Sequence, residues 1–85
     1  MTAQVTSSIP RMVDEPADVR FSSDNTPLAM RWHGRIWQAV GEPLAIASQT
    51  WRFKAQTGSV SPTLEFDIVS DPQSEELRLC RIAEG

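Results

Sequence analysis

The amino-acid sequence predicts an all-β domain, a small antiparallel, strongly curved sheet or partly open barrel of about five to six strands. Apolar and polar residues alternate in several short runs, as they do along strands that bury one face. These runs are separated by stretches of turn-forming residues, SSDNTP and SDPQS among them, and none shows a helical period of 3.6. The chain has 85 residues, which is enough for one domain with one core.

The N-terminal residues differ in composition from the rest of the chain. Residues 1–16 are polar, rich in Ser and Thr, and interrupted by Pro10 and Pro16, and they show no sustained period. We therefore predict a flexible tail over residues 1–16 and a single small β domain over residues 17–85. The first strand is expected where Val19 and Phe21 alternate with polar neighbours.

The stretch RWHGRIWQAV holds two of the three Trp and the only His of the chain, and its pattern predicts a hairpin. Alternating residues lie on both sides of His33 and Gly34, and a two-residue turn at these positions joins them into two paired strands. The apolar side chains of the facing pairs then share one face of the hairpin. The facing pairs are Trp32 with Arg35, Met30 with Trp37, and Leu28 with Ala39.

A second register is open to this hairpin. A three-residue loop with Gly34 in the left-handed region would shift the pairing by one residue. It would place Arg31 opposite Arg35 and Ala29 opposite Trp37. Because like charges directly opposite each other are unfavourable, we prefer the two-residue turn.

The middle of the chain is less uniform. The residues GEP at 41–43 interrupt the strand that follows the hairpin, and residues 44–47 fit either a short continuation of it or one helical turn. Over residues 41–50 the sequence leaves the conformation open. Trp51 and Phe53 then alternate with basic residues, which indicates another strand.

The last third of the chain carries the clearest strand pattern, LEFDIV. Its polar face holds Glu65 and Asp67, which we expect to be solvated, since paired carboxylates act as acid and base only when they are buried or forced together. A final strand is expected over residues 77–82, with Arg78 and Arg81 outward or at the rim.

Composition and charge limit the classes of function. The chain has 8 Lys and Arg against 11 Asp and Glu, a net charge of −3, which gives no global attraction to phosphate or anionic lipid. The first residues lack the pattern of a signal peptide, and no stretch has the roughly 18 to 20 apolar residues that span a bilayer. The single cysteine, Cys80, fits a reducing compartment. We expect a cytoplasmic protein that makes no membrane contact.

The reactive side chains are few. His33 and Cys80 are the only soft-metal ligands of the chain, whereas a structural zinc site needs four ligands. His33 reads as a turn residue and Cys80 as a small buried hydrophobe. Nucleophilic catalysis needs a Ser or Cys with a general base beside it, and the single His lies at the expected hairpin tip. The sequence also has no glycine-rich phosphate loop. We expect no enzyme activity, no metal and no cofactor.

One group of residues stands out as a candidate interaction surface. Arginine and tryptophan together can stack on nucleic-acid bases or anchor a protein interface. The alternative is that the tryptophans are core, because a small domain with three Phe needs their apolar area. In that case Arg35 beside Trp32 would form a cation–π contact at the edge of the core. The candidate residues are Arg31, Trp32, Arg35, Trp51 and Arg52.

The stretch PLAMRWHGRIWQAV resembles the signature of a family of small, mostly actinobacterial domains of unknown function. That signature is aromatic, any residue, Gly, Arg, any residue, aromatic, followed by valines. The segment LEFDIVSDPQSEELRLCRI is similar to the family's closing hairpin, and the resemblance covers roughly residues 17–83. The signature positions are Trp32, Gly34, Arg35, Trp37 and Val40.

The resemblance implies no activity and no catalytic residue. The chain departs from the family pattern at Leu77 and Ala83, where the family commonly has Trp. Some members of the family are associated with error-prone DNA polymerase proteins, and this association is the only function that the resemblance implies.

Two functions of different classes follow from these observations. The first is a non-catalytic β module that binds another protein through a sheet edge or the arginine–aromatic surface. The alternative is an accessory domain associated with DNA polymerase or DNA repair, which contacts nucleic acid through an Arg/Trp face. The net charge of −3 disfavours direct binding, which a basic face would partly rescue. That face would consist of Arg31, Arg35, Arg52 and Lys54.

Overall fold

A computed structural model describes residues 10–71, 73 and 76–84, and every regular element among them is a β-strand. The predicted all-β antiparallel fold is confirmed, with seven strands in one sheet of order β1-β7-β6-β5-β4-β3-β2. The described part of the chain contains no helix that could cross a membrane. The strands are β1 (Arg11–Pro16), β2 (Asp18–Phe21), β3 (Pro27–Trp32), β4 (Arg35–Ala47), β5 (Thr50–Gln56), β6 (Leu64–Ser70) and β7 (Leu77–Glu84).

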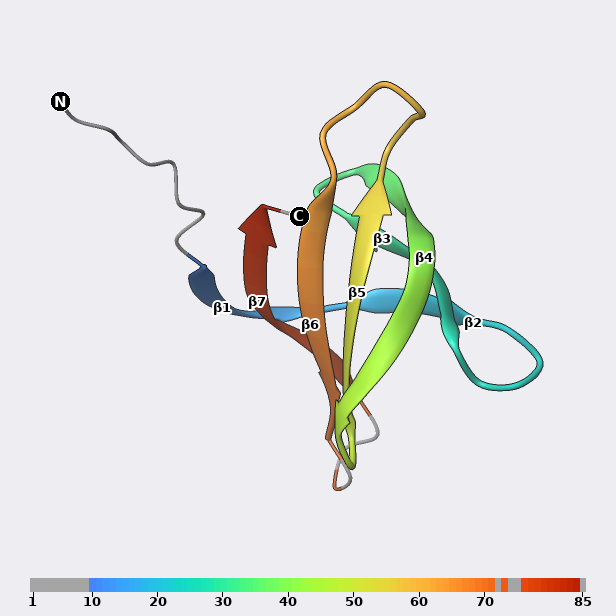
Figure 1. The fold of residues 1–85 in the computed structure, drawn as a ribbon. Coiled ribbons are helices and arrows are strands. Elements are labelled where there is room, and N and C mark those ends of the chain that lie inside the picture. The colour runs from blue at the N-terminus through green and yellow to red at the C-terminus, as the bar shows by residue number, and fades with distance from the viewer. Residues whose placement is uncertain (1–9, 72, 74–75, 85) are drawn as a thin grey trace, which may run out of the picture.

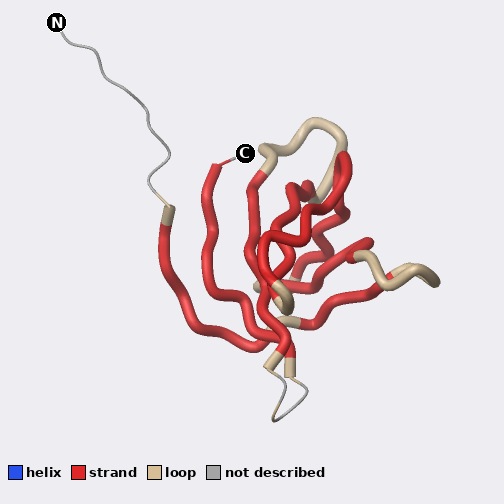
Figure 2. Tube along the Cα trace, turned by 60° about the horizontal axis from the view of Figure 1, so that its bottom comes forward, coloured by secondary structure: helices blue, strands red, loops and turns tan. Residues whose placement is uncertain are grey.

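The sheet curls into a half-barrel because its two outermost strands are neighbours in the chain (Figures 1 and 2). Strands β1 and β2 stand at opposite ends of the strand order and are separated only by Ala17. The amide of Ala17 donates to the carbonyl of Leu77 at 2.9 Å, which keeps the junction against β7. In Figure 1 this blue stretch crosses the steeper strands β5 and β6. The curl gives the sheet an inner face and an outer face.

The inner face holds the core. Strand alternation sends Phe53 and Phe66 from paired positions of β5 and β6 to this side, where their ring centroids lie 5.9 Å apart. Both side chains are almost fully buried. The other members of the buried cluster are Met30, Ala55, Ile68, Leu79 and Ile82.

The structure confirms the two-residue turn between β3 and β4. His33 and Gly34 both have positive φ, 52° and 75°, as a type I′ turn requires at its two central residues. Met30 pairs with Trp37, the register that the two-residue turn predicts. The alternative register is therefore wrong.

The expected place of Leu28 on the inner face is wrong. Phe21 pairs with Pro27 and Arg20 pairs with Ala29, so Leu28 is an extra residue in a β-bulge. The bulge moves Leu28 out of the alternation that starts at the hairpin. Leu28 is 49% exposed, and Pro27 is buried in its place.

The predicted boundary of the N-terminal tail is also wrong. Arg11–Pro16 forms β1, which pairs with β7, and Val13 packs against the core. The sequence pattern missed this strand because a bulge interrupts its pairing between Met12 and Glu15, which breaks the alternation. Residues 1–9 of the expected tail lie outside the described residues.

The open question at residues 41–50 is settled by a long strand. Strand β4 continues through the GEP sequence instead of ending there. Val40 pairs with Lys54 and Leu44 pairs with Arg52, so three residues on β4 lie opposite one on β5. Gly41 has a φ of 74° in this bulge, which a residue with a side chain rarely adopts. The short-continuation alternative is correct.

Candidate functional site on the outer face

The two tryptophans of the predicted interaction surface face the core. Trp32 stacks on His33 with ring centroids 3.9 Å apart, and its Nε1 donates to Glu15 Oε1 at 2.9 Å. No cation–π contact with Arg35 is recorded among the described residues, where the ring contacts of Trp32 are with aromatic side chains. Trp51 packs against the core cluster as well.

The three arginines of that predicted surface lie in different surroundings. Arg31 is exposed on the outer face, paired with Ile36 of β4. Arg52 is on the outer face too, where it is bound to Asp67. Arg35 is exposed where β4 begins, at the hairpin turn. The structure therefore splits the five predicted residues between two faces of the sheet and does not gather them into one surface.

No aromatic side chain remains for an outer binding surface. The chain has three Trp, three Phe and no Tyr. All six belong to the core cluster or pack against it, so the described residues provide no exposed ring on which a base could stack. The six are Phe21, Trp32, Trp37, Trp51, Phe53 and Phe66.

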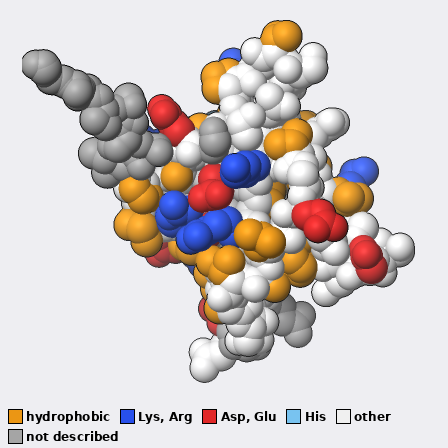
Figure 3. All heavy atoms as spheres, viewed as in Figure 1, with side chains coloured by type: hydrophobic (Ala, Val, Ile, Leu, Met, Phe, Trp, Pro, Cys, Tyr) orange, Lys and Arg blue, Asp and Glu red, His pale blue; other side chains and the backbone are white. Residues whose placement is uncertain are grey.

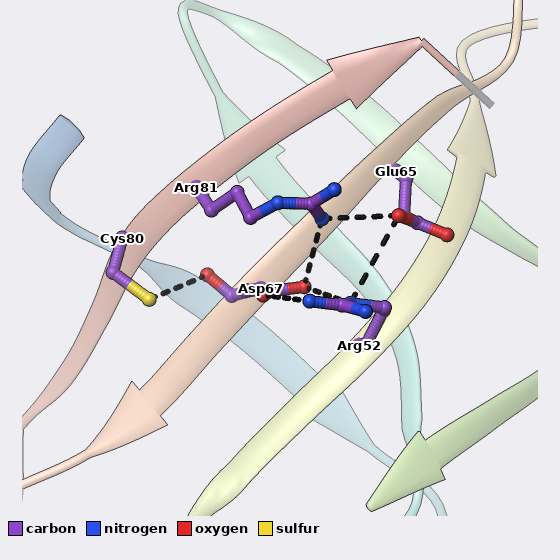
Figure 4. A network of polar contacts seen from close by, with 5 residues as sticks. All are labelled: Arg52, Glu65, Asp67, Cys80 and Arg81. Carbon is purple, nitrogen blue, oxygen red and sulfur yellow. Dashed lines mark hydrogen bonds and ion pairs between the residues drawn. The ribbon is translucent and has the colours of Figure 1, made fainter. Parts of the chain in front are cut away.

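The outer face of β5–β7 carries a closed network of charges (Figure 4). Asp67 is only 4% exposed and lies between Arg52 and Arg81, its cross-strand partners on both sides. Arg52 donates two hydrogen bonds to its carboxylate at 2.8 and 2.9 Å, and Arg81 Nη1 lies 3.5 Å from Asp67 Oδ1. Glu65 accepts from Arg81 at 3.0 Å. Two cations and two anions thus neutralise one another.

The expectation that Asp67 is solvated is wrong, and the reason lies in the sheet order. Central strands place an arginine on each side of the carboxylate, and the register brings both within reach. The hydrogen bond to Asp67 raises the pKa of Arg52 above its ordinary value. The carboxylate is therefore held by salt bridges, which is the arrangement of a structural ion pair rather than of a general base.

Cys80 lies beside this network and is partly buried. Its Sγ donates to the carbonyl of Asp67 at 3.5 Å. Burial raises the pKa of the Cys80 thiol above its ordinary value, and the negative charge of Asp67 raises it further. A thiol that keeps its proton is a poor nucleophile and a poor metal ligand. Among the described residues, no group of three or more His, Cys, Asp and Glu could hold a metal ion.

A row of apolar side chains lies on the outer face of β4. Ile36, Val40 and Leu44 are 47%, 37% and 59% exposed. The register places them on the same face as the outward side chains of β3 and β5, because Ile36 pairs with Arg31 and Leu44 with Arg52. We call these three residues the β4 row. Figure 3 shows the outer face of the sheet, where hydrophobic side chains lie next to basic and acidic ones.

A shallow basin of about 360 Å³ lies beside one end of the β4 row. Its charged lining residues are Arg20, Arg31 and Asp18. Ile36 and Gln38 form its border on β4. Within the described part of the chain, neither arginine makes a recorded hydrogen bond or ion pair. Among the described residues, two arginines without a recorded ion pair therefore lie beside Asp18 and next to the exposed side chain of Ile36.

Comparison of the chain with protein-family models, with curated proteins and with solved structures finds no match. The resemblance to the actinobacterial domain family, stated from the sequence, therefore stays a prediction.

Sequence reasoning missed the β4 row, although a signal for it was present. Trp37 and Ile36 are adjacent on one strand, and both are large and apolar. Because neighbouring residues on a strand point to opposite faces, one of the two had to be outward. Single apolar residues on the solvent face of a strand are common, whereas contiguous exposed apolar patches are typical of interaction sites.

Proposed function

We propose that this protein is a non-catalytic, cytoplasmic module that binds another protein through the outer face of β4. The observation that carries the proposal is the β4 row itself, three large apolar side chains left exposed along one strand. Contiguous exposed apolar surface with a polar border is typical of protein interfaces. The charged neighbours of the row, Arg31 and Lys54, supply such a border.

The face of the sheet is a better binding surface than its edges. A partner strand that pairs with an edge needs unpaired backbone groups along it. Strand β1 carries a bulge and ends in Pro16, and β2 has only four residues. Proline, bulges and short length are features that prevent edge pairing. The structure thus favours contact through side chains on the outer face.

The inward position of the aromatic rings disfavours a nucleic-acid surface that stacks bases. The closed charge network disfavours acid-base catalysis. Among the residues that the structure describes, Asp67 is the one buried carboxylate, and its charge cluster is closed by Arg52 and Arg81. The alternative function, an accessory role with DNA polymerase or DNA repair proteins, is supported by Arg20 and Arg31, which have no recorded ion pair among the described residues and could contact phosphate. It would lack the base stacking expected of an Arg/Trp face.

The experiment compares surface variants of the full chain. Val40→Ser and Leu44→Ser together remove most of the β4 row, while Val60→Ser removes an apolar side chain that is 97% exposed in the loop between β5 and β6. Proteins retained from extracts of the native cell by each immobilised variant are quantified by mass spectrometry. Thermal melts confirm that all variants are folded.

We expect a specific protein to be retained by the wild type and the Val60 variant and lost with the double variant. Retention of the same proteins by all three would refute the proposal. Loss of every retained protein with the Val60 variant as well would show that binding depends on general hydrophobicity and not on the β4 row.

A further inference from the structure

We infer that the partner segment bound on this face is acidic, with carboxylates that bind Arg20 and Arg31 and apolar side chains that cover the β4 row. This inference rests on the proposed function and names the chemistry of the partner. The basin beside Ile36 is the place where the two kinds of contact meet.

Arg20 and Arg31 differ in their pairing from the arginines of β5–β7. Every guanidinium on the outer face of β5–β7 has an acidic partner, as Arg52 and Arg81 have in Asp67. Arg20 and Arg31 have none recorded among the described residues, and they adjoin a single carboxylate, Asp18. Arg11, Arg35 and Lys54 also lack a recorded partner among the described residues, but Arg20 and Arg31 are the two such cations that line one basin. Carboxylates from a partner would give these two arginines the pairing that Arg52 and Arg81 have within the chain.

The spacing of Arg20 and Arg31 matches that of alternate residues in an extended peptide. Arg20 pairs with Ala29, so Arg31 is its diagonal neighbour on the adjoining strand. Diagonal neighbours in an antiparallel pair lie about 7–8 Å apart. Alternate residues of an extended peptide are spaced by about 6.6–6.8 Å, which is two strand rises. Two carboxylates at alternate positions of an extended segment therefore match the two guanidinium groups.

The surface that continues from the basin along β4 carries the exposed apolar side chains of the β4 row. Ile36 borders the basin and is followed outward on β4 by Val40 and Leu44. A segment that binds Arg31 through a carboxylate and continues along β4 meets Ile36, Gln38, Val40 and Leu44. Glu42 and Lys54 lie beside the last two. A nucleic acid would place a phosphate at each nucleotide of that path without an exposed ring to stack on. An acidic and apolar peptide fits both parts of the surface.

The test uses three defined probes and the full chain. The first is a fluorescent ten-residue peptide with Glu at positions 1 and 3, Val at positions 5, 7 and 9 and Ser at the even positions, so that Glu and Val share one face of the extended chain. The second is the same peptide with Lys for Glu, and the third is a ten-nucleotide oligothymidylate. Binding is measured by fluorescence anisotropy and mapped by amide and arginine side-chain NMR shifts. The variant Arg20→Glu/Arg31→Glu is compared with Arg11→Glu, which changes an exposed charge on β1 away from the basin.

We expect the acidic peptide to bind, with shifts confined to the basin and the β4 row. The double charge reversal should weaken it by about tenfold or more, as removal of interfacial charge pairs does, and the Arg11 variant should change it little. Failure of the acidic peptide to bind, or equal binding of the Lys peptide, overturns the inference. Oligothymidylate binding that depends on Arg20 and Arg31 overturns it as well. If Val40→Ser/Leu44→Ser still releases a cellular protein while the acidic peptide does not bind, the proposed function stands and this inference alone fails.

Discussion

The outer face of the sheet has two halves, which differ in whether their arginine side chains form ion pairs. On β5–β7, Asp67 lies between Arg52 and Arg81, and hydrogen bonds and ion pairs close the network. On β2–β4, Arg31 lies between Asp18 and Ile36, and no ion pair with Asp18 is recorded in the described part of the chain. The same sheet thus has a closed half and an open half. Each half places an acid directly opposite an arginine, Asp67 opposite Arg52 and Asp18 opposite Arg31, but among the described residues only the first of these two pairs forms an ion pair.

The largest expected loss of stability distinguishes the inner face of β4 from its outer face. Trp37 packs against Phe66 with ring centroids 5.3 Å apart, and its neighbour Ile36 is outward. Trp37→Ala should destabilise the domain by about 3 kcal/mol, the low end for loss of a core Trp, because Trp37 is only partly buried. Ile36→Ser should cost less than about 1 kcal/mol. Thermal and urea unfolding of both variants measure the difference.

A Trp37→Ala protein that melts within a degree or two of the wild type would contradict this expectation. It would mean that the hairpin contributes little to the core and that Trp37 belongs with the binding surface. The half described as open would then be open on both of its faces.

The second prediction breaks the closed half. Asp67→Ala removes the acceptor of both Arg52 hydrogen bonds and leaves two guanidinium groups without their shared carboxylate. Hydrogen bonds to a charged group are worth about 1.5–3 kcal/mol, so we expect a loss of stability of about 2 kcal/mol. The matched change in the open half, Arg31→Ala, removes an exposed charge without a recorded partner and should cost less than about 0.5 kcal/mol. Urea unfolding at low salt gives both values.

Equal stability of the two variants would remove the distinction between the halves. A large loss for Arg31→Ala would show that Arg31 is held by the fold. It would then be unavailable to a partner.

Local patterns in the sequence predicted most of the fold and little of the surface. The alternation around His33 and Gly34 was sufficient for the turn and its register, because both are set by neighbouring residues. Strand β1 was missed because its partner β7 lies more than sixty residues away and a bulge breaks its pattern. The burial of Asp67 was missed for a related reason. It depends on which strands flank β6, and this sheet order is not visible in one strand.

The third prediction tests the turn that fixes which residues of β4 face outward. Gly34 has a φ of 75°, and the space around a β-carbon at this position is empty. Gly34→Val should therefore cost about 1–2 kcal/mol from backbone strain alone, without a steric clash. The Val60→Ser variant serves as a control for a change at another exposed site. An unchanged urea midpoint for Gly34→Val would mean that the turn tolerates a side chain, and the register would need another determinant.

The smallest expected effect concerns Cys80 at the border of the closed half. Burial and the charge of Asp67 raise the pKa of its thiol, so the native protein should react with iodoacetamide more slowly at pH 8 than the urea-unfolded chain. A raised pKa in the folded state means that folding favours the protonated thiol. This contribution to stability is complete below the ordinary thiol pKa and is lost as the pH rises through the raised value.

The pH dependence of alkylation connects this thiol to the comparison between the halves. Asp67→Asn removes a negative charge near Cys80 and should move the native reaction profile to lower pH, while burial keeps it above the unfolded profile. Arg31→Ala, in the open half, should leave the profile where it is, because Arg31 is not among the groups that act on Cys80. If Arg31→Ala shifts the profile as much as Asp67→Asn does, the charges of the two halves are coupled. Arg31 would then be part of the internal balance of the fold, which would remove the reason to assign it to an acidic partner.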